Sequence, residues 1–207
     1  MTSSLASVRA SVGGRWKRIQ KKHRPKVSRY YSRPLSPDDP DRSVNGFRFV
    51  EADHDNLARL KASFPKELSD RKRDILAQRI QDPSEDAWMI LDEGDRLCGF
   101  ACLAWDDHEV KLMQHTIRVR PHQALFMDDY VFKKHRRRGA QSAAVELRVG
   151  LAAAHGRTEG LVLVSTTNLG SISSYRKAGF QTCGRLIHFP TSKRTLEFWI
   201  PRPLRHG

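Results

Sequence analysis

The sequence has 207 residues, of which 39% are hydrophobic, enough for one domain of ordinary size with a short extension. No uninterrupted apolar stretch approaches the roughly 20 residues that a membrane-spanning helix needs. The 37 Lys and Arg outnumber the 23 Asp and Glu, and the three cysteines show no CxxC or other paired metal-ligand spacing. The composition therefore argues against a membrane-spanning protein, a disulfide scaffold and a zinc site. We expect a cytoplasmic protein without a metal.

The positive charge is concentrated in residues 1–37, which contain ten Lys and Arg and no acidic residue. Four prolines between residues 25 and 40 predict an extended linker from about Ser28 to Asn45. We therefore divide the chain into a basic arm and linker over residues 1–45 and one domain over residues 46–207. Four roles for the arm stay open. They are a solvated disordered extension, adsorption to an anionic membrane surface, contact with nucleic acid, and a cleaved targeting peptide.

The domain begins with a predicted strand and two predicted helices. Residues 47–50 alternate apolar and polar side chains, which is typical of a strand. Asp53 or Asp55 can cap a helix that ends near Phe64, and a second helix runs from about residue 68 to the Asp82-Pro83 stop. The many charges between residues 66 and 79 are more typical of a solvated outer face than of a substrate clamp.

Further along, the pattern predicts more strands. Residues 88–91 and 97–103 flank a turn and form a hairpin, and residues 116–119 form a short strand before a proline. Residues 161–164 form a buried strand, and residues 185–189 and 196–200 form a closing hairpin. The order is therefore strands, two helices, strands, helix, strand, helix and hairpin.

The most informative stretch lies between Leu125 and Ala154. An apolar run over 125–132 is interrupted by Asp128 and Asp129, then come six consecutive basic residues, Gly139, and alanines and leucines at helical spacing. The start of a helix presents unpaired N–H groups and a positive dipole end, and a glycine there lets an anion approach closely. The turn is therefore compatible with a diphosphate site and, on charge alone, equally with a solvated basic turn.

Two motifs in this order resemble the GNAT N-acetyltransferase superfamily. The first is Arg136-x-x-Gly139, which is similar to the turn Gln/Arg-x-x-Gly-x-Gly/Ala that binds the pyrophosphate of acetyl-coenzyme A in that family. The second is Asn168-x-x-Ser171-x-x-x-Tyr175-x-x-x-Gly179-Phe180, whose Asn and Tyr flank the thioester end. The resemblance covers residues 47–200. It departs from the family pattern at Gln141, which replaces a small residue.

The resemblance implies an α/β (α+β layered) fold with a mixed, mostly antiparallel sheet of about six to seven strands and about four helices. It also implies acetyl-CoA as cosubstrate, held where the signature strand separates from the next strand. The residues that would contact it are Tyr130, Val131 and Phe132 along the pantetheine arm, Arg136, Arg137, Arg138, Gly139, Ala140 and Gln141 at the phosphates, and Asn168 and Ser171.

Two residues are predicted to transfer protons. Tyr175 matches the family's general acid, and a phenol with a pKa near 10 can protonate a thiolate whose conjugate acid has a pKa near 8.5. Asp128 matches an acidic position of the family's signature strand and is the predicted general base, whereas Asp129 points to the opposite face unless a bulge intervenes. The alternatives are a tyrosine that packs on the sheet and a carboxylate paired with nearby arginines. His115 and His122 are reserve bases.

We expect acyl-CoA-dependent N-acyl transfer, with acetyl passing directly to a primary amine such as an amino sugar or another small-molecule amine. The alternative is a catalytically weak or inactive GNAT-shaped binding module, because Gln141 can crowd the pyrophosphate. The basic arm of such a module, over residues 1–37, would contact nucleic acid or an anionic membrane. A homodimer and peripheral attachment to a membrane stay open.

Overall fold

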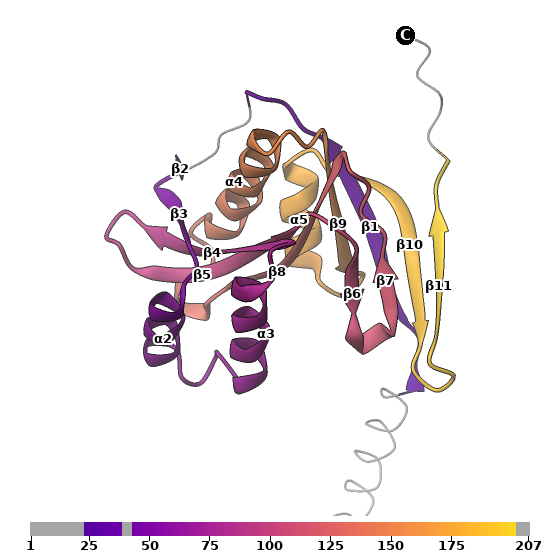
Figure 1. Ribbon diagram of the computed structural model, residues 1–207, viewed down its shortest axis with the longest axis horizontal. Coiled ribbons are helices and arrows are strands. Elements are labelled where there is room, and N and C mark those ends of the chain that lie inside the picture. Colours follow the sequence, from indigo (N-terminus) through magenta and orange to yellow (C-terminus); the bar gives the residue numbers. More distant parts are fainter. Residues whose placement is uncertain (1–22, 39–42, 202–207) are drawn as a thin grey trace, which may run out of the picture.

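The computed structural model describes residues 23–38 and 43–201 of the chain (Figure 1). The first 22 residues of the predicted basic arm lie outside the described residues. The arm's four predicted roles therefore stay predictions.

A nine-stranded sheet forms the centre of the molecule, in the order β11-β10-β1-β9-β8-β5-β4-β3-β2. Neighbouring strands run antiparallel except β8 and β9, which pair in parallel. The strands are β1 (Lys26–Pro34), β2 (Ser43–Val44), β3 (Phe47–Glu51), β4 (Glu85–Asp92), β5 (Leu97–Ala104), β8 (Gln123–Val131), β9 (Glu159–Ser165), β10 (Gln181–Phe189) and β11 (Arg194–Trp199). A separate hairpin joins β6 (His108–Val110) to β7 (His115–Ile117).

Four α-helices are present in the described residues: α2 (His54–Ser63), α3 (Asp70–Gln81), α4 (Ala140–Ala154) and α5 (Leu169–Lys177). Short 3-10 helices follow β6 and β8, at Lys111–Met113 and Lys133–His135. The predicted class, a mixed and mostly antiparallel α/β fold with four helices, is confirmed. The sheet has more strands than predicted.

The helices cover the sheet on two sides. Figure 1 shows α4 and α5 on one face and α2 and α3 on the other. Alanines and leucines of α4 pack with Phe126 and Val162 in one apolar cluster, and Leu60 and Leu76 pack with Phe100 in a second cluster. Each face of the sheet therefore has its own core, as expected for a layered α/β protein.

The predicted linker is wrong over residues 28–34, which belong to strand β1. This strand lies between β9 and β10, antiparallel to both, and its Tyr30 and Tyr31 are fully buried. The flanking prolines mark its limits instead of breaking it, because Pro34 is the last residue of the strand and ends the ladder there. The folded domain therefore includes residues that we assigned to the arm.

The parallel pair β8 and β9 separates partway along its length. Pairing joins Gln123–Phe126 to Glu159–Val162, although both strands continue beyond these residues. Asp128 has a φ of +46°, and the pairing of β5 with β8 shifts register between Phe100 and Cys102. The bulge bends β8 away from β9, so backbone groups of both strands face a gap. The predicted separation of the signature strand is confirmed.

Candidate active site

A cavity of about 480 Å³ is lined by the end of β8, the turn that follows and the first residues of α4 and α5. Nine of the thirteen predicted site residues line it. They are Tyr130, Val131, Arg136, Arg137, Gly139, Ala140, Gln141, Asn168 and Ser171. Phe132, Arg138, Asp128 and Tyr175 are the four predicted residues outside this lining.

Gly139 is the N-cap of α4 and has a φ of +88°, in the left-handed region that favours glycine. No side chain caps this helix, so the N–H groups of Ala140 and Gln141 have no partner within the helix. A Cβ at Gly139 would meet only the Phe47 ring, at 4.0 Å. The conformation therefore requires glycine, and the space in front of its backbone is open to an anion.

The three predicted arginines have different surroundings. Arg136 donates from Nε to the Val131 carbonyl at 2.9 Å, and its guanidinium lies 5.4 Å from the centre of the Tyr130 ring. Arg138 lies 3.7 Å from the Asp92 carboxylate, outside the cavity lining. Arg137 lines the cavity and has no ion pair within the described chain. Arg137 is therefore the arginine best placed to bind a phosphate.

Phe132 does not reach the cavity. Its ring is fully buried and stacks on Phe64 with ring centroids 3.6 Å apart, and its N–H donates to the Cys98 carbonyl at 2.9 Å. Because neighbouring side chains of an extended chain alternate between faces, Val131 and Phe132 cannot both face the gap. The predicted cofactor contact at Phe132 is not supported.

A buried polar network lies behind the cavity. Arg148, in the middle of α4, is fully buried and donates from Nη2 to the Asp129 carboxylate at 3.1 Å and to the Tyr175 hydroxyl at 3.0 Å. The Tyr175 hydroxyl donates to Asp129 at 3.4 Å, and the Gln141 amide also donates to Asp129. The larger side chain of Gln141 is therefore bound to Asp129 at the cavity wall.

Arg148 occupies the point where the sheet opens. Its Nη1 lies 3.5 Å from the carbonyl oxygens of Met127 and Cys102. Met127 is the first residue of β8 beyond its pairing with β9, and Cys102 adjoins the register shift in β5. The guanidinium therefore donates to carbonyl groups at the point where pairing with β9 ends and the pairing of β5 with β8 shifts register. Sequence analysis missed Arg148, although a cation between Ala144 and Leu151 on an apolar helix face was a usable signal.

Tyr175 contributes its hydroxyl to this network and is not part of the cavity lining, whereas Ser171 and Ser174 of the same helix are. Burial raises the pKa of Tyr175 well above its ordinary value, although the neighbouring Arg148 charge opposes this rise. The phenol is protonated at neutral pH, but its raised pKa makes it a weaker acid towards a thiolate than the ordinary value near 10 implies. Its transfer of a proton to a thiolate stays a prediction.

Asn168 caps helix α5, since its Oδ1 accepts from the Ser171 N–H at 3.2 Å. Both residues line the cavity at the start of this helix. The predicted position beside the cofactor and the alternative role as a helix cap are therefore compatible.

Asp128 is bonded to an arginine of α3. Its carboxylate accepts from Arg79 at 3.1 Å, and Arg79 also binds Glu85 at 2.6 Å. His108 lies 2.9 Å from Glu85, so a chain of charged and polar groups runs along the α3 side of the sheet. Burial opposes the charge of Arg79, but Asp128 and Glu85 outweigh burial and raise its pKa. Asp128 is therefore paired with an arginine, as in the alternative prediction, but the partner is Arg79 of α3 and not one of the arginines that follow β8.

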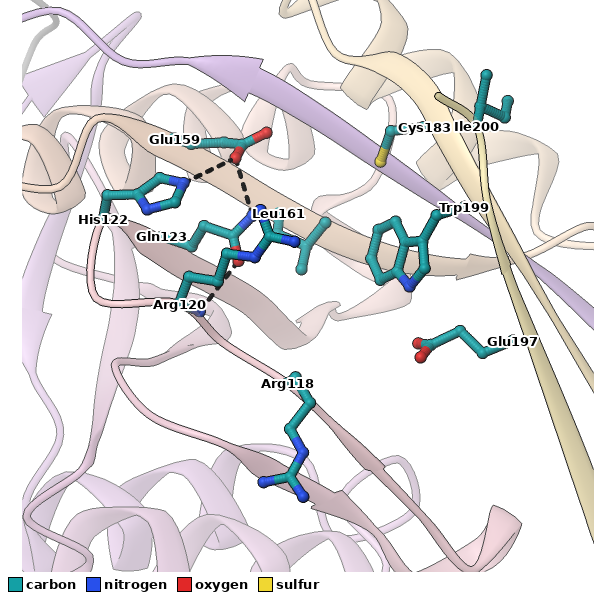
Figure 2. Close-up of a pocket in the computed structure, with 10 residues that line it drawn as sticks. All are labelled: Arg118, Arg120, His122, Gln123, Glu159, Leu161, Cys183, Glu197, Trp199 and Ile200. Carbon is teal, nitrogen blue, oxygen red and sulfur yellow. Dashed lines mark hydrogen bonds and ion pairs between the residues drawn. The ribbon is translucent and has the colours of Figure 1, made fainter. Parts of the chain in front are cut away.

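A second cavity of about 490 Å³ lies between the end of β7 and the strands β9, β10 and β11 (Figure 2). His122 lines it and lies 3.5 Å from Glu159, while Glu197 of the same cavity lies 3.4 Å from His115. Neither of the two reserve histidines lines the cavity at the gap between β8 and β9.

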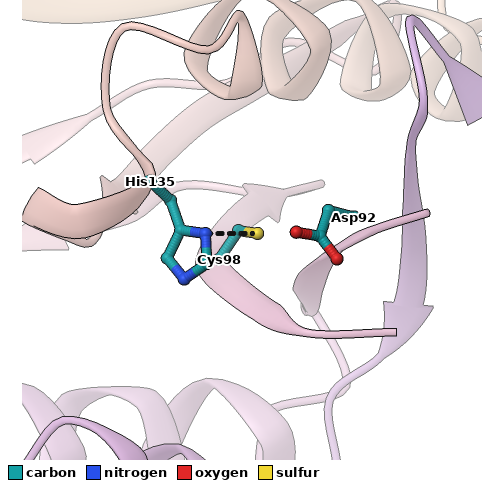
Figure 3. Close-up of side chains that lie close together, drawn as sticks. All are labelled: Asp92, Cys98 and His135. Atoms are coloured by element: carbon teal, nitrogen blue, oxygen red, sulfur yellow. Dashed lines mark hydrogen bonds between the residues drawn. The ribbon is translucent and has the colours of Figure 1, made fainter. Parts of the chain in front are cut away.

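Three buried side chains, Asp92, Cys98 and His135, bring their donor atoms within 4.8 Å of one another (Figure 3). Cys98 Sγ lies 3.1 Å from His135 Nδ1. The pKa of Asp92 is lowered to about 2, and the largest cause is a hydrogen bond from the Arg96 side chain. Burial raises the pKa of the Cys98 thiol to about 11 and lowers that of His135. In the structure the Asp92 carboxylate is bound to Arg96 and the Cys98 thiol contacts His135.

The fold, with its separated parallel strands and open helix start, defines the class of the protein, and a family model agrees. The model for the acetyltransferase (GNAT) family matches residues 54–180, so the chain belongs to this family.

Solved structures share the fold at low sequence identity. An acetyltransferase of the GNAT family from Novosphingobium aromaticivorans is 15% identical with a TM-score of 0.52, over 86% of this chain and 66% of that chain. A GCN5-related N-acetyltransferase from Sphaerobacter thermophilus is 16% identical with a TM-score of 0.52, over 91% of this chain and 58% of that chain. This chain therefore spans about three fifths of their length. No curated protein sequence matches it. None of the helices in the described residues is long and apolar enough to span a membrane.

Proposed function

We propose that the protein transfers an acetyl group from acetyl-CoA to a primary amine by direct attack of the amine on the thioester. The observation that carries the proposal is the cavity where β8 parts from β9, which opens onto the uncapped start of α4. A helix start with free N–H groups suits a diphosphate, and the open edge of a strand suits the amide groups of a pantetheine arm.

The residues present fit such a cosubstrate. The N–H groups around Gly139 and Ala140, together with the Arg137 guanidinium, would hold the phosphates. The edge of β8 at Tyr130 and Val131, beyond its pairing with β9, would hold the pantetheine arm and polarise the thioester carbonyl. Acetyl-CoA supplies an already activated acyl group. The protein therefore has to position the amine, remove its proton and protonate the departing thiolate.

Proton transfer is assigned to residues on the two sides of the sheet. We propose Tyr175 as the general acid, because its phenol is protonated at neutral pH and is oriented by Arg148 and Asp129. We propose Asp128 as the general base, because its side chain is 38% exposed on the α3 side, where a small amine would approach. Arg79 would then orient the Asp128 carboxylate.

The substitution Gly139→Glu tests the cofactor site, with Gly156→Glu as a matched control. Both glycines have positive φ, +88° and +72°, and a Cβ meets almost nothing at either position, so the backbone strain is similar. Gly139→Glu should abolish acetyl-CoA binding measured by calorimetry, and Gly156→Glu should bind like the wild type. Equal binding by the two variants would place the diphosphate elsewhere.

A catalytically inactive binding module is the second candidate. The observation that favours it is that neither Tyr175 nor Asp128 lines the cavity, and each is bonded to an arginine, Arg148 and Arg79 respectively. Release of free thiol from acetyl-CoA in the presence of a panel of small amines separates the two functions. Acetyl-CoA binding without turnover on any amine would favour the module.

A further inference from the structure

The strands β1, β10 and β11 form one side of the sheet, which Figure 1 shows beyond α5. Exposed large apolar side chains are concentrated on its edge strand. Of the six in the described residues, four lie in or directly after β11: Leu196, Phe198, Trp199 and Ile200, each 47–54% exposed. An apolar edge strand is a liability for a protein in water unless another surface covers it.

The strand register assigns these side chains to two faces. Leu196 pairs with Ile187 and Phe198 pairs with Arg185, and alternate residues along a strand share a face. Trp199 lies on the other face, where it stacks on Tyr30 at 4.5 Å. We call the face that carries Leu196, Phe198 and Ile187 the outer face.

The outer face is also cationic. Arg185 pairs in the sheet with Arg29, and Arg194 lies two residues before Leu196, so all three arginines belong to this face. None of the three has an ion pair within the described part of the chain. Residues 26–34 and 181–200 contain six Lys and Arg and a single acidic residue, Glu197. Glu197 lies on the opposite face, where it accepts a hydrogen bond from Tyr30.

We propose that the outer face of β1, β10 and β11 binds the surface of an anionic lipid bilayer. Such a surface offers both partners that this face needs, since headgroup phosphates and carboxylates match the arginines, and the acyl boundary accepts Leu196 and Phe198. Nucleic acid would match the charge but leave the aliphatic Leu196 and Ile187 exposed. A second copy of the chain would cover the apolar groups but oppose arginines to arginines.

The sequence next to this face carries the same charge. Residues 1–22, which precede β1, contain six Lys and Arg and no acidic residue. The outer face therefore continues a run of positive charge, and membrane binding is favoured by the sum of such contributions.

Sedimentation of the full-length protein with lipid vesicles tests the proposal. The protein should bind vesicles of phosphatidylcholine mixed with phosphatidylglycerol and should not bind pure phosphatidylcholine. Replacing two arginines, Arg185→Gln with Arg194→Gln, should weaken binding about 30-fold at low salt, since each basic residue near the surface contributes about a factor of five. Leu196→Ser with Phe198→Ser should weaken it by at least about tenfold, because less apolar area inserts.

A matched control removes exposed apolar groups elsewhere. Leu112 and Leu169 are 57% and 74% exposed and lie outside β11, so Leu112→Ser with Leu169→Ser should leave vesicle binding unchanged. Wild-type binding by both outer-face variants would overturn the proposal, as would equal binding to neutral vesicles. Sedimentation velocity, which measures the oligomeric state, tests the alternative that the outer face binds a second copy of the chain. The outer face would be assigned to a second copy of the chain if two results were found together. The wild type would be a dimer that the double variant Leu196→Ser with Phe198→Ser converts to a monomer, and this variant would bind vesicles like the wild type.

Competition between duplex RNA and the anionic vesicles tests the remaining alternative, that the outer face binds nucleic acid. If RNA binds more tightly than the anionic vesicles, and Leu196→Ser with Phe198→Ser leaves RNA and vesicle binding unaltered, the face serves nucleic acid and the lipid proposal fails. The two outer-face variants alter different side chains, so one of them is informative if the other does not fold.

Discussion

Replacing Arg148 by Met should destabilise the fold strongly. The variant keeps an unbranched apolar side chain but removes the guanidinium, which donates to Asp129, Tyr175 and the Ala144 carbonyl and approaches two carbonyls at the gap between strands. Removing one member of a buried ion pair typically costs about 3–5 kcal/mol, because the remaining charge stays buried without a partner.

The lower end of that range applies here. The Asp129 side chain is 18% exposed, so water at the cavity can solvate part of the abandoned carboxylate. We expect Arg148→Met to lower the free energy of unfolding by about 3 kcal/mol, a large share of the 5–15 kcal/mol typical of a domain.

Urea unfolding at equilibrium measures this change, and Asp129→Asn with Arg148→Met completes a double-mutant cycle. If the unpaired carboxylate causes the loss, the double variant should be at least as stable as Arg148→Met. A loss below about 1 kcal/mol, a typical value for one ordinary hydrogen bond, would contradict the claim that removing Arg148 leaves Asp129 as an unpaired buried charge.

Two further predictions concern proton-binding groups. Tyr175→Phe should lower amine-dependent thiol release by about 100-fold or more while leaving acetyl-CoA affinity unchanged, because general acid catalysis contributes factors of that size; wild-type turnover would remove Tyr175 from the mechanism. Asp92→Asn should change the pH dependence of the melting temperature. The pKa of Asp92 is lowered to about 2 in the fold, so its stabilising effect is present above its ordinary pKa near 4 and is lost as the pH falls towards 2. The wild type should therefore melt higher than Asp92→Asn at pH 6, and the difference should vanish near pH 2; a constant difference would contradict this reasoning.

The local elements of the fold could be predicted from the sequence because their signals are local. The glycine turn, the α4 periodicity and the Asn168 cap each depend on a few neighbouring residues. Strand β1 could not be predicted in this way. Its pairing with β9 and β10 joins residues more than a hundred positions apart, and the adjacent prolines and arginines are also typical of a linker.

The site residues likewise divide into those that a local motif predicts and those whose positions depend on the tertiary structure. Arg136 and Gly139 follow from the motif and line the predicted cavity, whereas the positions of Phe132 and Arg138 depend on how the chain bends after the bulge at Asp128. The partners of these charged side chains were also not predictable. Arg79 reaches Asp128, and Arg148 reaches Asp129, across elements that only the tertiary structure brings together.

Strand β1 has a consequence for biosynthesis. Among the described strands it is synthesised first, yet both of its neighbours lie in the last quarter of the given sequence. At 5–20 residues per second, translation separates them by on the order of ten seconds. Strand β1, which carries Tyr30 and Tyr31, therefore has no partner strand until the segments that form β9 and β10 have been synthesised.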